Sequence, residues 1–142
     1  MDLHIYGNIE DQTYFNKIKP LFNNNIKYLG PINSQNKYRL LKKYNVLIYP
    51  SYSENFGIII LEALNAGLYV LVRKNLPWKN LNSKFGKLIN INKNSLEKNI
   101  ILLSKKSKLK KINDDKKYLR NYLIGNFGWK KISNLYLKIY NI

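Results

Sequence analysis

Hydrophobic residues along this chain follow two patterns that alternate. Short, continuous apolar runs are typical of buried strands, and the segments between them carry apolar residues every three or four positions, as on one face of a helix. The runs expected to form strands are residues 2–6, 26–29, 46–49, 69–72 and 86–89. Strands that alternate with helices usually form a parallel sheet. The pattern therefore predicts an α/β fold, a Rossmann-like parallel sheet flanked by helices.

The segments with helical spacing lie between these strands and after the last of them. Helices are expected over residues 10–22, after Ser34 as an N-cap, over the segment that ends at Gly67, from Asn94 onwards, around residues 118–123 and over about 128–140. A lysine-rich stretch, residues 105–117, is expected to be a solvated linker between helices.

One stretch, from Pro50 to Gly67, contains most of the candidate chemistry. It reads PSYSENFGIIILEALNAG and follows the apolar run 46–49. A polar turn leads into strong helix-forming residues, and Gly67 stands where a helix needs a left-handed stop. Open α/β sheets bind ligands in such loops, at the carboxyl ends of their strands.

Two acids mark this stretch. Glu54 precedes the expected helix and Glu62 lies within it among apolar residues, where burying a carboxylate is costly unless it is paired. Structural roles are available to both, since Glu54 could stabilise the helix start and Glu62 could form an ion pair. As a pair around a glycine-containing helix start, they favour a ligand site. The first-turn amides near Phe56, Gly57 and Ile58 would bind phosphate oxygens, and Glu62 would accept hydrogen bonds from a diol.

The run SENFGIIILEALNAG resembles the E-x7-E signature of retaining glycosyltransferases with the GT-B fold, a large family that includes many lipopolysaccharide and exopolysaccharide sugar transferases. The resemblance is specific at residues 50–67 and looser elsewhere. It implies hexosyl transfer from a nucleotide-diphosphate sugar to a saccharide or lipid-linked acceptor, with no cofactor and no metal.

The resemblance also implies roles for individual residues. Glu54 would be the catalytic residue and would contact the donor sugar, and Glu62 would hold the ribose. Pro31 and Ile32 would lie near the base, although a simple turn explains Pro31 equally well. Residues that would bind the donor sugar and its phosphates are Glu54, Asn55, Phe56, Gly57 and Ile58.

Positions after the fourth strand give two further structural expectations. Arg73 and Lys74 end that strand beside the expected pocket, where a solvated loop is a simpler interpretation than a contact with the diphosphate. Trp78 is expected to pack over the pocket rim.

The resemblance covers the chain from about Leu3 onwards and corresponds to one domain of a two-domain enzyme. Residues 1–142 are expected to form a single nucleotide-sugar-binding domain of the GT-B C-terminal type, truncated at its N-terminus. The family's preceding strand, with an Arg/Lys pair that grips the diphosphate, and the acceptor domain have no counterpart here. The chain would then be a donor-binding half that needs a separate acceptor-domain chain, and its final helix would pack back toward that domain.

Charge suggests a second interpretation. The chain of 142 residues carries 25 Lys+Arg against 8 Asp+Glu, a formal net charge of +17. A basic module with a decayed nucleotide pocket, binding nucleic acid or membrane, is therefore the alternative function. Nucleic acid is not expected as a partner because arginine, which base reading favours, occurs only as Arg39, Arg73 and Arg120. Peripheral contact with an anionic membrane fits the lysines. Without a long apolar segment or a basic leader, a cytoplasmic location at the inner face of the membrane is expected.

Overall fold

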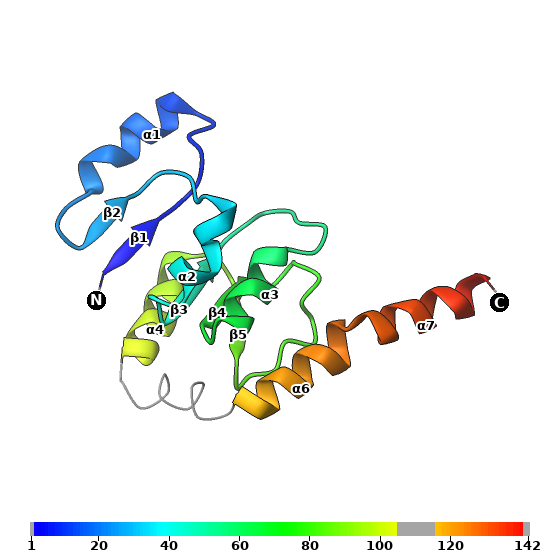
Figure 1. The fold of residues 1–142 in the computed structure, drawn as a ribbon. Helices are drawn as coiled ribbons and strands as arrows, with labels where there is room; N and C mark the ends of the chain where they lie inside the picture. Colours follow the sequence, from blue (N-terminus) through cyan, green and yellow to red (C-terminus); the bar gives the residue numbers. More distant parts are fainter. Residues whose placement is uncertain (1, 105–115, 141–142) are drawn as a thin grey trace. The chain divides into compact units, whose positions relative to one another are not determined.

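The computed structural model describes residues 2–104 and 116–140 (Figure 1). The chain divides into two compact units, Met1–Arg39 and Leu40–Ile142. Parallel strands with helices between them occur in both units. The predicted α/β class is therefore confirmed.

Unit 1 is a parallel strand pair connected through a helix. Its elements are β1 (Leu3–Ile5), α1 (Gln12–Ile18), the 3-10 turn η1 (Lys19–Leu21), β2 (Ile26–Tyr28) and the 3-10 turn η2 (Ser34–Asn36). Asp11 caps α1 by accepting a hydrogen bond from the Tyr14 amide at 2.8 Å. The expected cap at Ser34 is wrong, because the Asn33 side chain accepts the Gln35 amide one residue earlier. The Asx turn therefore makes Asn33, and not Ser34, the cap of η2.

Unit 2 holds a three-stranded parallel sheet in the order β3-β4-β5. The helix α2 (Lys37–Leu41) runs across the boundary between the units and ends at the buried Leu41. The remaining elements are β3 (Val46–Tyr49), α3 (Ile58–Asn65), β4 (Tyr69–Arg73), β5 (Gly86–Ile89), α4 (Lys93–Ser104), α6 (Lys116–Phe127) and α7 (Trp129–Tyr140). The expected fifth strand, residues 86–89, is therefore present.

Both faces of this sheet are covered, which explains why its strands read as continuous apolar runs. Along β4 the side chains alternate: Val70 and Val72 enter the larger core cluster with α3 and α6. Leu71, between them, joins Leu103 of α4 on the opposite face. All three β4 residues are fully buried, so β4 is the centre of the unit.

The four strands at residues 2–6, 26–29, 46–49 and 69–72 were expected in one sheet, and this expectation is wrong. They form two sheets, β1-β2 and β3-β4-β5. The pairing direction is parallel throughout, as predicted. Among the described residues, β1 and β3 share no ladder.

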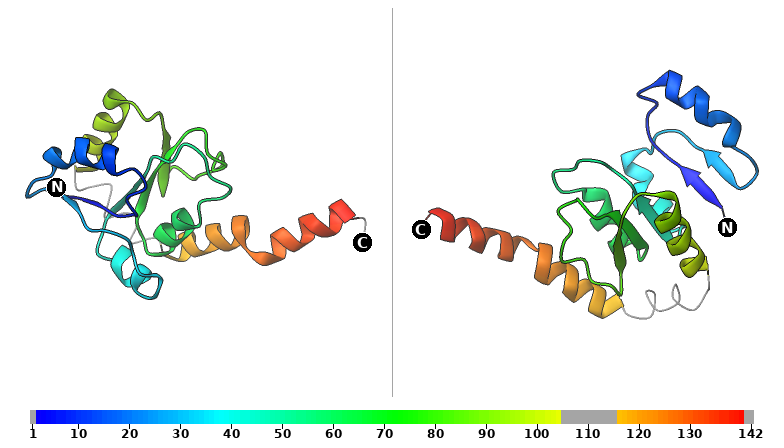
Figure 2. Two further views of the ribbon diagram at one scale, coloured as in Figure 1. Left: turned by 90° about the horizontal axis from the view of Figure 1, so that it is seen from above. Right: turned by 180° about the vertical axis from the view of Figure 1, so that it is seen from behind.

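The C-terminal part of the chain is helical. Residues 105–115 of the expected lysine-rich linker lie outside the described residues, and α6 already begins at Lys116. The last expected helix, about 128–140, is α7, which continues outward from the end of α6 and away from the sheet of unit 2 (Figure 2). None of the described helices has both the length and the apolar character needed to cross a bilayer.

Candidate functional site

The start of α3 gives the predicted site its backbone. Gly57 precedes the helix in the left-handed conformation, with φ +73°. A Cβ at this position would lie 3.0 Å from Ile60 Cδ1, so the turn suits glycine on both counts. No side chain within the described part of the chain caps this helix start. The Ile60 amide donates to the Gly57 carbonyl at 2.9 Å, so the amides of Ile58 and Ile59 are the ones in this first turn that an acceptor outside the chain could bind.

Glu54 is held by the strand that precedes its loop. The Tyr49 hydroxyl, at the end of β3, donates a hydrogen bond to Glu54 Oε1. Burial first, and then the hydrogen bond and negative charge of Glu54, raise the pKa of Tyr49 to about 12. The phenol thus keeps its proton at neutral pH and fixes one carboxylate oxygen, so Glu54 is positioned rather than free to rotate.

Glu62 lies on a different side of α3 from the core. It follows the exposed Ile58 by four residues, and residues so spaced share one face of a helix. The buried members of α3 are Ile60, Ala63 and Leu64. Glu62 itself is half-buried. Ile60, Ala63 and Leu64 therefore face the core, whereas the Glu62 carboxylate lies on another side of the helix, with its Oε2 atom buried there.

Trp78 connects the loop after β4 to the loop that contains Glu54. Its side chain is 2% exposed, and its indole Nε1 donates to the Phe56 carbonyl at 2.6 Å. The Trp78 ring lies 5.4 Å from that of Phe56 and 4.9 Å from that of Phe127, the last residue of α6. The expected packing role of Trp78 is thus observed, and it fixes the carbonyl one residue before Gly57.

Arg73 is placed differently from the solvated loop that the sequence suggested. It ends β4, one residue beyond Val72, which pairs with Tyr49 of β3. Its guanidinium carbon lies 3.8 Å from the ring centroid of Tyr52, a residue of the Glu54 loop. Its Nη1 atom is buried and finds no acceptor among the described residues. A buried donor of this kind is costly unless an external acceptor completes it.

The structure brings together most of the predicted residues. Glu54, Asn55, Phe56, Gly57 and Ile58 form the loop and first turn of α3, and Glu62 follows one turn later on the same helix. Pro31 and Ile32 follow β2 and belong to unit 1, so their role beside a base stays a prediction. Within the described residues, no three His, Asp or Glu side chains gather closely enough to hold a metal ion.

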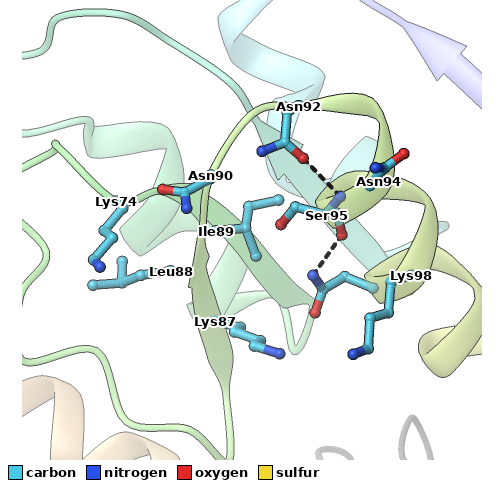
Figure 3. A pocket seen from close by; sticks show the side chains of 10 residues that line it. Lys74, Lys87, Leu88, Ile89, Asn90, Asn92, Asn94, Ser95 and Lys98 are labelled. Carbon is cyan, nitrogen blue, oxygen red and sulfur yellow. Dashed lines mark hydrogen bonds between the residues drawn. The ribbon is translucent and has the colours of Figure 1, made fainter.

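A hollow of about 500 Å³ lies farther along the same sheet, at the ends of β4 and β5 (Figure 3). It is lined by Lys74, Lys87, Leu88, Ile89, Asn90, Asn92, Asn94, Ser95, Lys98 and Asn99. The start of α4 contributes to it, but Asn92 already accepts the Ser95 amide at 2.8 Å. The lysines make this hollow positively charged. Its helix start differs from that of α3, because a side chain caps α4 and none of the described side chains caps α3.

Sequence reasoning missed Tyr49 and Tyr52 and undervalued Arg73. Tyr49 precedes Glu54 by five residues and looked like one more apolar strand residue. The signal available was positional, since Tyr49 and Arg73 both close a strand at the carboxyl edge where ligands bind. Tyrosine and arginine in such positions offer hydrogen-bond donors to the edge as well as packing.

Comparison with known proteins gives the site its context. The family described as "Glycosyl transferases group 1" matches residues 1–121. None of the curated proteins matches the chain. Among solved structures, the chain is similar to one described as "Crystal structure of GtfA/B complex", with 20% sequence identity and a TM-score of 0.66. That similarity covers 93% of this chain and 29% of the solved one, and it shows a shared fold.

The matched region contains the Glu54 loop, α3 and Arg73, and the fold agrees with that of the C-terminal half of a GT-B enzyme. Because the family match extends over residues 1–121 of 142, the chain belongs to the glycosyl transferases group 1 family.

Proposed function

We propose that this chain is the donor-binding half of a retaining glycosyltransferase that moves a hexosyl group from a nucleotide-diphosphate sugar to a saccharide or lipid-linked acceptor. Glycosyl transfer is the activity of the family to which the chain belongs. The observation that carries the finer proposal is the open start of α3 at Gly57, with Glu54 before it and Glu62 within the helix. The biosynthesis of lipopolysaccharide or exopolysaccharide is the process in which we place it.

The distal phosphate is assigned to the start of α3. Helix N-termini attract anions because their first amides lack intrahelical partners and the dipole is positive there. Gly57 leaves room for a phosphate to approach the backbone. At the start of α4 the Asn92 side chain already binds the Ser95 amide, whereas no described side chain caps α3, which favours α3 although α4 is surrounded by more lysines.

The sugar is assigned to Glu54. Tyr49 occupies Oε1, and we propose that Oε2 accepts hydrogen bonds from the sugar hydroxyls. A carboxylate fixed in this position also opposes the positive charge that develops on the sugar ring as the glycosidic bond to phosphate breaks. Holding Glu54 in advance reduces the reorganisation that the reaction requires.

Arg73 is assigned to the diphosphate. A phosphate oxygen would complete the buried Nη1 donor through a charge-assisted hydrogen bond, and Tyr52 keeps the guanidinium oriented meanwhile. The resemblance also implies that an Arg/Lys pair on a preceding strand would grip the diphosphate. Arg73 would supply part of that positive charge from β4.

The remaining donor contacts follow the family pattern. We propose that Glu62 binds the ribose diol and that Pro31 and Ile32 lie near the base. No metal or cofactor enters this proposal, because amides and Arg73 supply the charges that the diphosphate needs. The alternative, a basic module with a decayed pocket, would retain the lysines but lose nucleotide-sugar binding.

A partner chain is also part of the proposal. The chain spans 29% of the solved chain that it resembles, and that solved structure is of a complex. Sugar transfer requires donor and acceptor in one cleft. We therefore expect the purified chain to bind a donor but to transfer sugar only when an acceptor-domain chain is added.

Binding of a panel of nucleoside diphosphates and their hexose conjugates, followed by calorimetry, tests the proposal. Wild type should bind at least one conjugate. Arg73→Gln should weaken both the diphosphate and its conjugate about tenfold to a hundredfold, because a hydrogen bond to a charged group contributes about 1.5–3 kcal/mol. Arg120→Gln, which removes the same charge from the exposed face of α6, is the matched control and should change affinity little. Binding that is abolished by moderate salt and equal for both variants would instead support the basic-module alternative.

A further inference from the structure

The peptide unit between Phe56 and Gly57 has a fixed orientation. Its carbonyl oxygen, that of Phe56, accepts a hydrogen bond from the Trp78 indole at 2.6 Å. A trans peptide is planar, with its N–H directed away from its carbonyl, so the Gly57 amide points away from Trp78. Within the described part of the chain, no acceptor binds this amide. The indole therefore determines the side of the loop on which the Gly57 N–H is presented.

The backbone that follows makes the direction of this amide important. Gly57 is left-handed, with φ 73° and ψ 61°, and Ile58 begins the right-handed helix α3. Successive amides at such a change of hand converge and form a concave cradle for an anion. The Gly57 amide is thus the first of three donors, followed by those of Ile58 and Ile59, whereas the Ile60 amide already donates to the Gly57 carbonyl. Trp78 directs the first donor of this cradle.

Glycine at position 57 would also allow the opposite orientation of this peptide. Rotating the peptide unit by half a turn reverses the sign of φ at Gly57 and exchanges the directions of the carbonyl and the N–H. Glycine adopts both signs of φ at similar cost, so the residue itself selects only weakly between the two forms. In the rotated form a carbonyl oxygen would face the cradle and repel an anion. The hydrogen bond from Trp78 therefore favours the form that binds anions.

The loop that contains Trp78 is itself fixed to α6. The Tyr122 hydroxyl donates to the Asn80 carbonyl at 3.1 Å and accepts from the Asn82 amide at 3.3 Å. The Trp78 side chain is only 2% exposed, and a buried indole N–H needs a partner within the protein because water does not reach it. The indole is therefore held from α6 on one side and by the Phe56 carbonyl on the other.

We infer that Trp78 is a positioning residue for the donor site: its indole N–H orients the Phe56–Gly57 peptide so that the Gly57 amide binds the distal phosphate of the donor. The inference rests on the proposed function, which assigns that phosphate to the start of α3. Trp78 acts through the peptide and not on the ligand, because its indole nitrogen is occupied by the Phe56 carbonyl.

Calorimetry on the full-length chain with inorganic pyrophosphate and with a nucleoside diphosphate tests the inference. Trp78→Phe keeps an aromatic ring beside Phe56 and removes the N–H, so it should weaken both probes about tenfold, the effect of one hydrogen bond to a charged group. Phe127→Leu is the matched control, because the Phe127 ring packs 4.9 Å from that of Trp78 and 5.8 Å from that of Phe56 without making the hydrogen bond. It should lower the stability of the fold and change either affinity little.

The Gly57 amide can also be observed directly by NMR. The chain has seven glycines, so protein labelled with ¹⁵N only at glycine gives a simple spectrum, in which the loss of one signal in Gly57→Ala identifies Gly57. Pyrophosphate should move this signal of wild type to lower field, as expected for an amide that donates to an anion. In Trp78→Phe the signal of the free protein should broaden or split, because both peptide orientations are then populated. A residue with only a packing role would not produce this change.

Tyr122→Phe provides a second variant in case Trp78→Phe does not fold. It releases the Trp78 loop from α6 without altering the indole, and it should weaken both probes about threefold. Equal affinity losses in Trp78→Phe and Phe127→Leu would overturn the inference and leave the proposed function intact. So would unchanged affinity in Tyr122→Phe, or a Gly57 signal that stays in place while wild type binds pyrophosphate. If wild type binds neither pyrophosphate nor any nucleoside diphosphate, the inference and the proposed donor site fail together.

Discussion

Replacing Tyr49 with phenylalanine tests the link between the sheet and Glu54. The substitution keeps the ring and removes only the hydroxyl that donates to Glu54 Oε1. Because burial and the Glu54 carboxylate raise the pKa of Tyr49 from 10.0 to about 12, the folded protein holds this proton more tightly than the unfolded chain. Tyr49 should therefore stabilise the fold below pH 10 and lose that contribution as pH rises from 10 to about 12.

The magnitude follows from the pKa. A rise of the pKa from 10.0 to about 12 corresponds to an upper limit of about 2.7 kcal/mol. The phenol is only half-buried, and solvent screening should reduce this to about 1 kcal/mol. Between pH 10 and pH 12, the free energy of unfolding of wild type should therefore fall by about 1 kcal/mol more than that of Tyr49→Phe. The lysines and the other tyrosines titrate in both proteins, so their effects cancel in this difference.

Urea unfolding of both proteins, repeated between pH 8 and pH 12, measures the difference. The single variant Glu54→Gln and the double variant complete a mutant cycle, in which the coupling between Tyr49 and Glu54 should be present at pH 8 and absent near pH 12. Parallel pH profiles for wild type and Tyr49→Phe would refute the assignment. So would a coupling free energy of zero at pH 8, because the hydrogen bond would then contribute nothing.

The glycines give further predictions, each measured by urea unfolding. Gly57→Ala should destabilise the fold by roughly 1–2 kcal/mol, because its left-handed backbone disfavours a Cβ, and it should also weaken nucleotide-sugar binding; unchanged stability would argue against the observed turn. Gly86→Ala should cost about 1–3 kcal/mol, since its Cβ would lie 2.6 Å from the Val70 carbonyl oxygen. Gly125→Ala, in α6 with nothing within 4 Å of the added atom, should instead stabilise by up to about 1 kcal/mol, and a loss there would contradict the helix assignment.

The strands could be predicted well because their apolar runs have one simple cause. β4 is covered on both faces, so Tyr69 to Val72 had to be apolar throughout and could not be mistaken for a loop. The start of α3 was also predictable, because Gly57 follows a polar turn and precedes strong helix formers. The E-x7-E spacing then located the acids.

Contacts between distant parts of the chain could not be predicted in the same way. The contact between Tyr52 and Arg73 joins residues 21 positions apart, one in the Glu54 loop and one at the end of β4. No local pattern encodes such a contact, and a cation after a strand usually is a solvated residue. The division of the strands into two sheets was missed for a similar reason, because pairing between strands depends on long-range contacts that periodicity does not report.

The central claim is that Glu54 and Glu62 divide the donor between sugar and ribose. Calorimetry with a nucleoside diphosphate and its sugar conjugate, on wild type, Glu54→Gln and Glu62→Gln, tests it most directly, with the exposed Glu97→Gln of α4 as matched control. Glu62→Gln should weaken both ligands about tenfold to a hundredfold, and Glu54→Gln should weaken only the conjugate. Equal losses of both ligands in Glu54→Gln, or no binding of any conjugate by wild type with or without a partner chain, would contradict the claim.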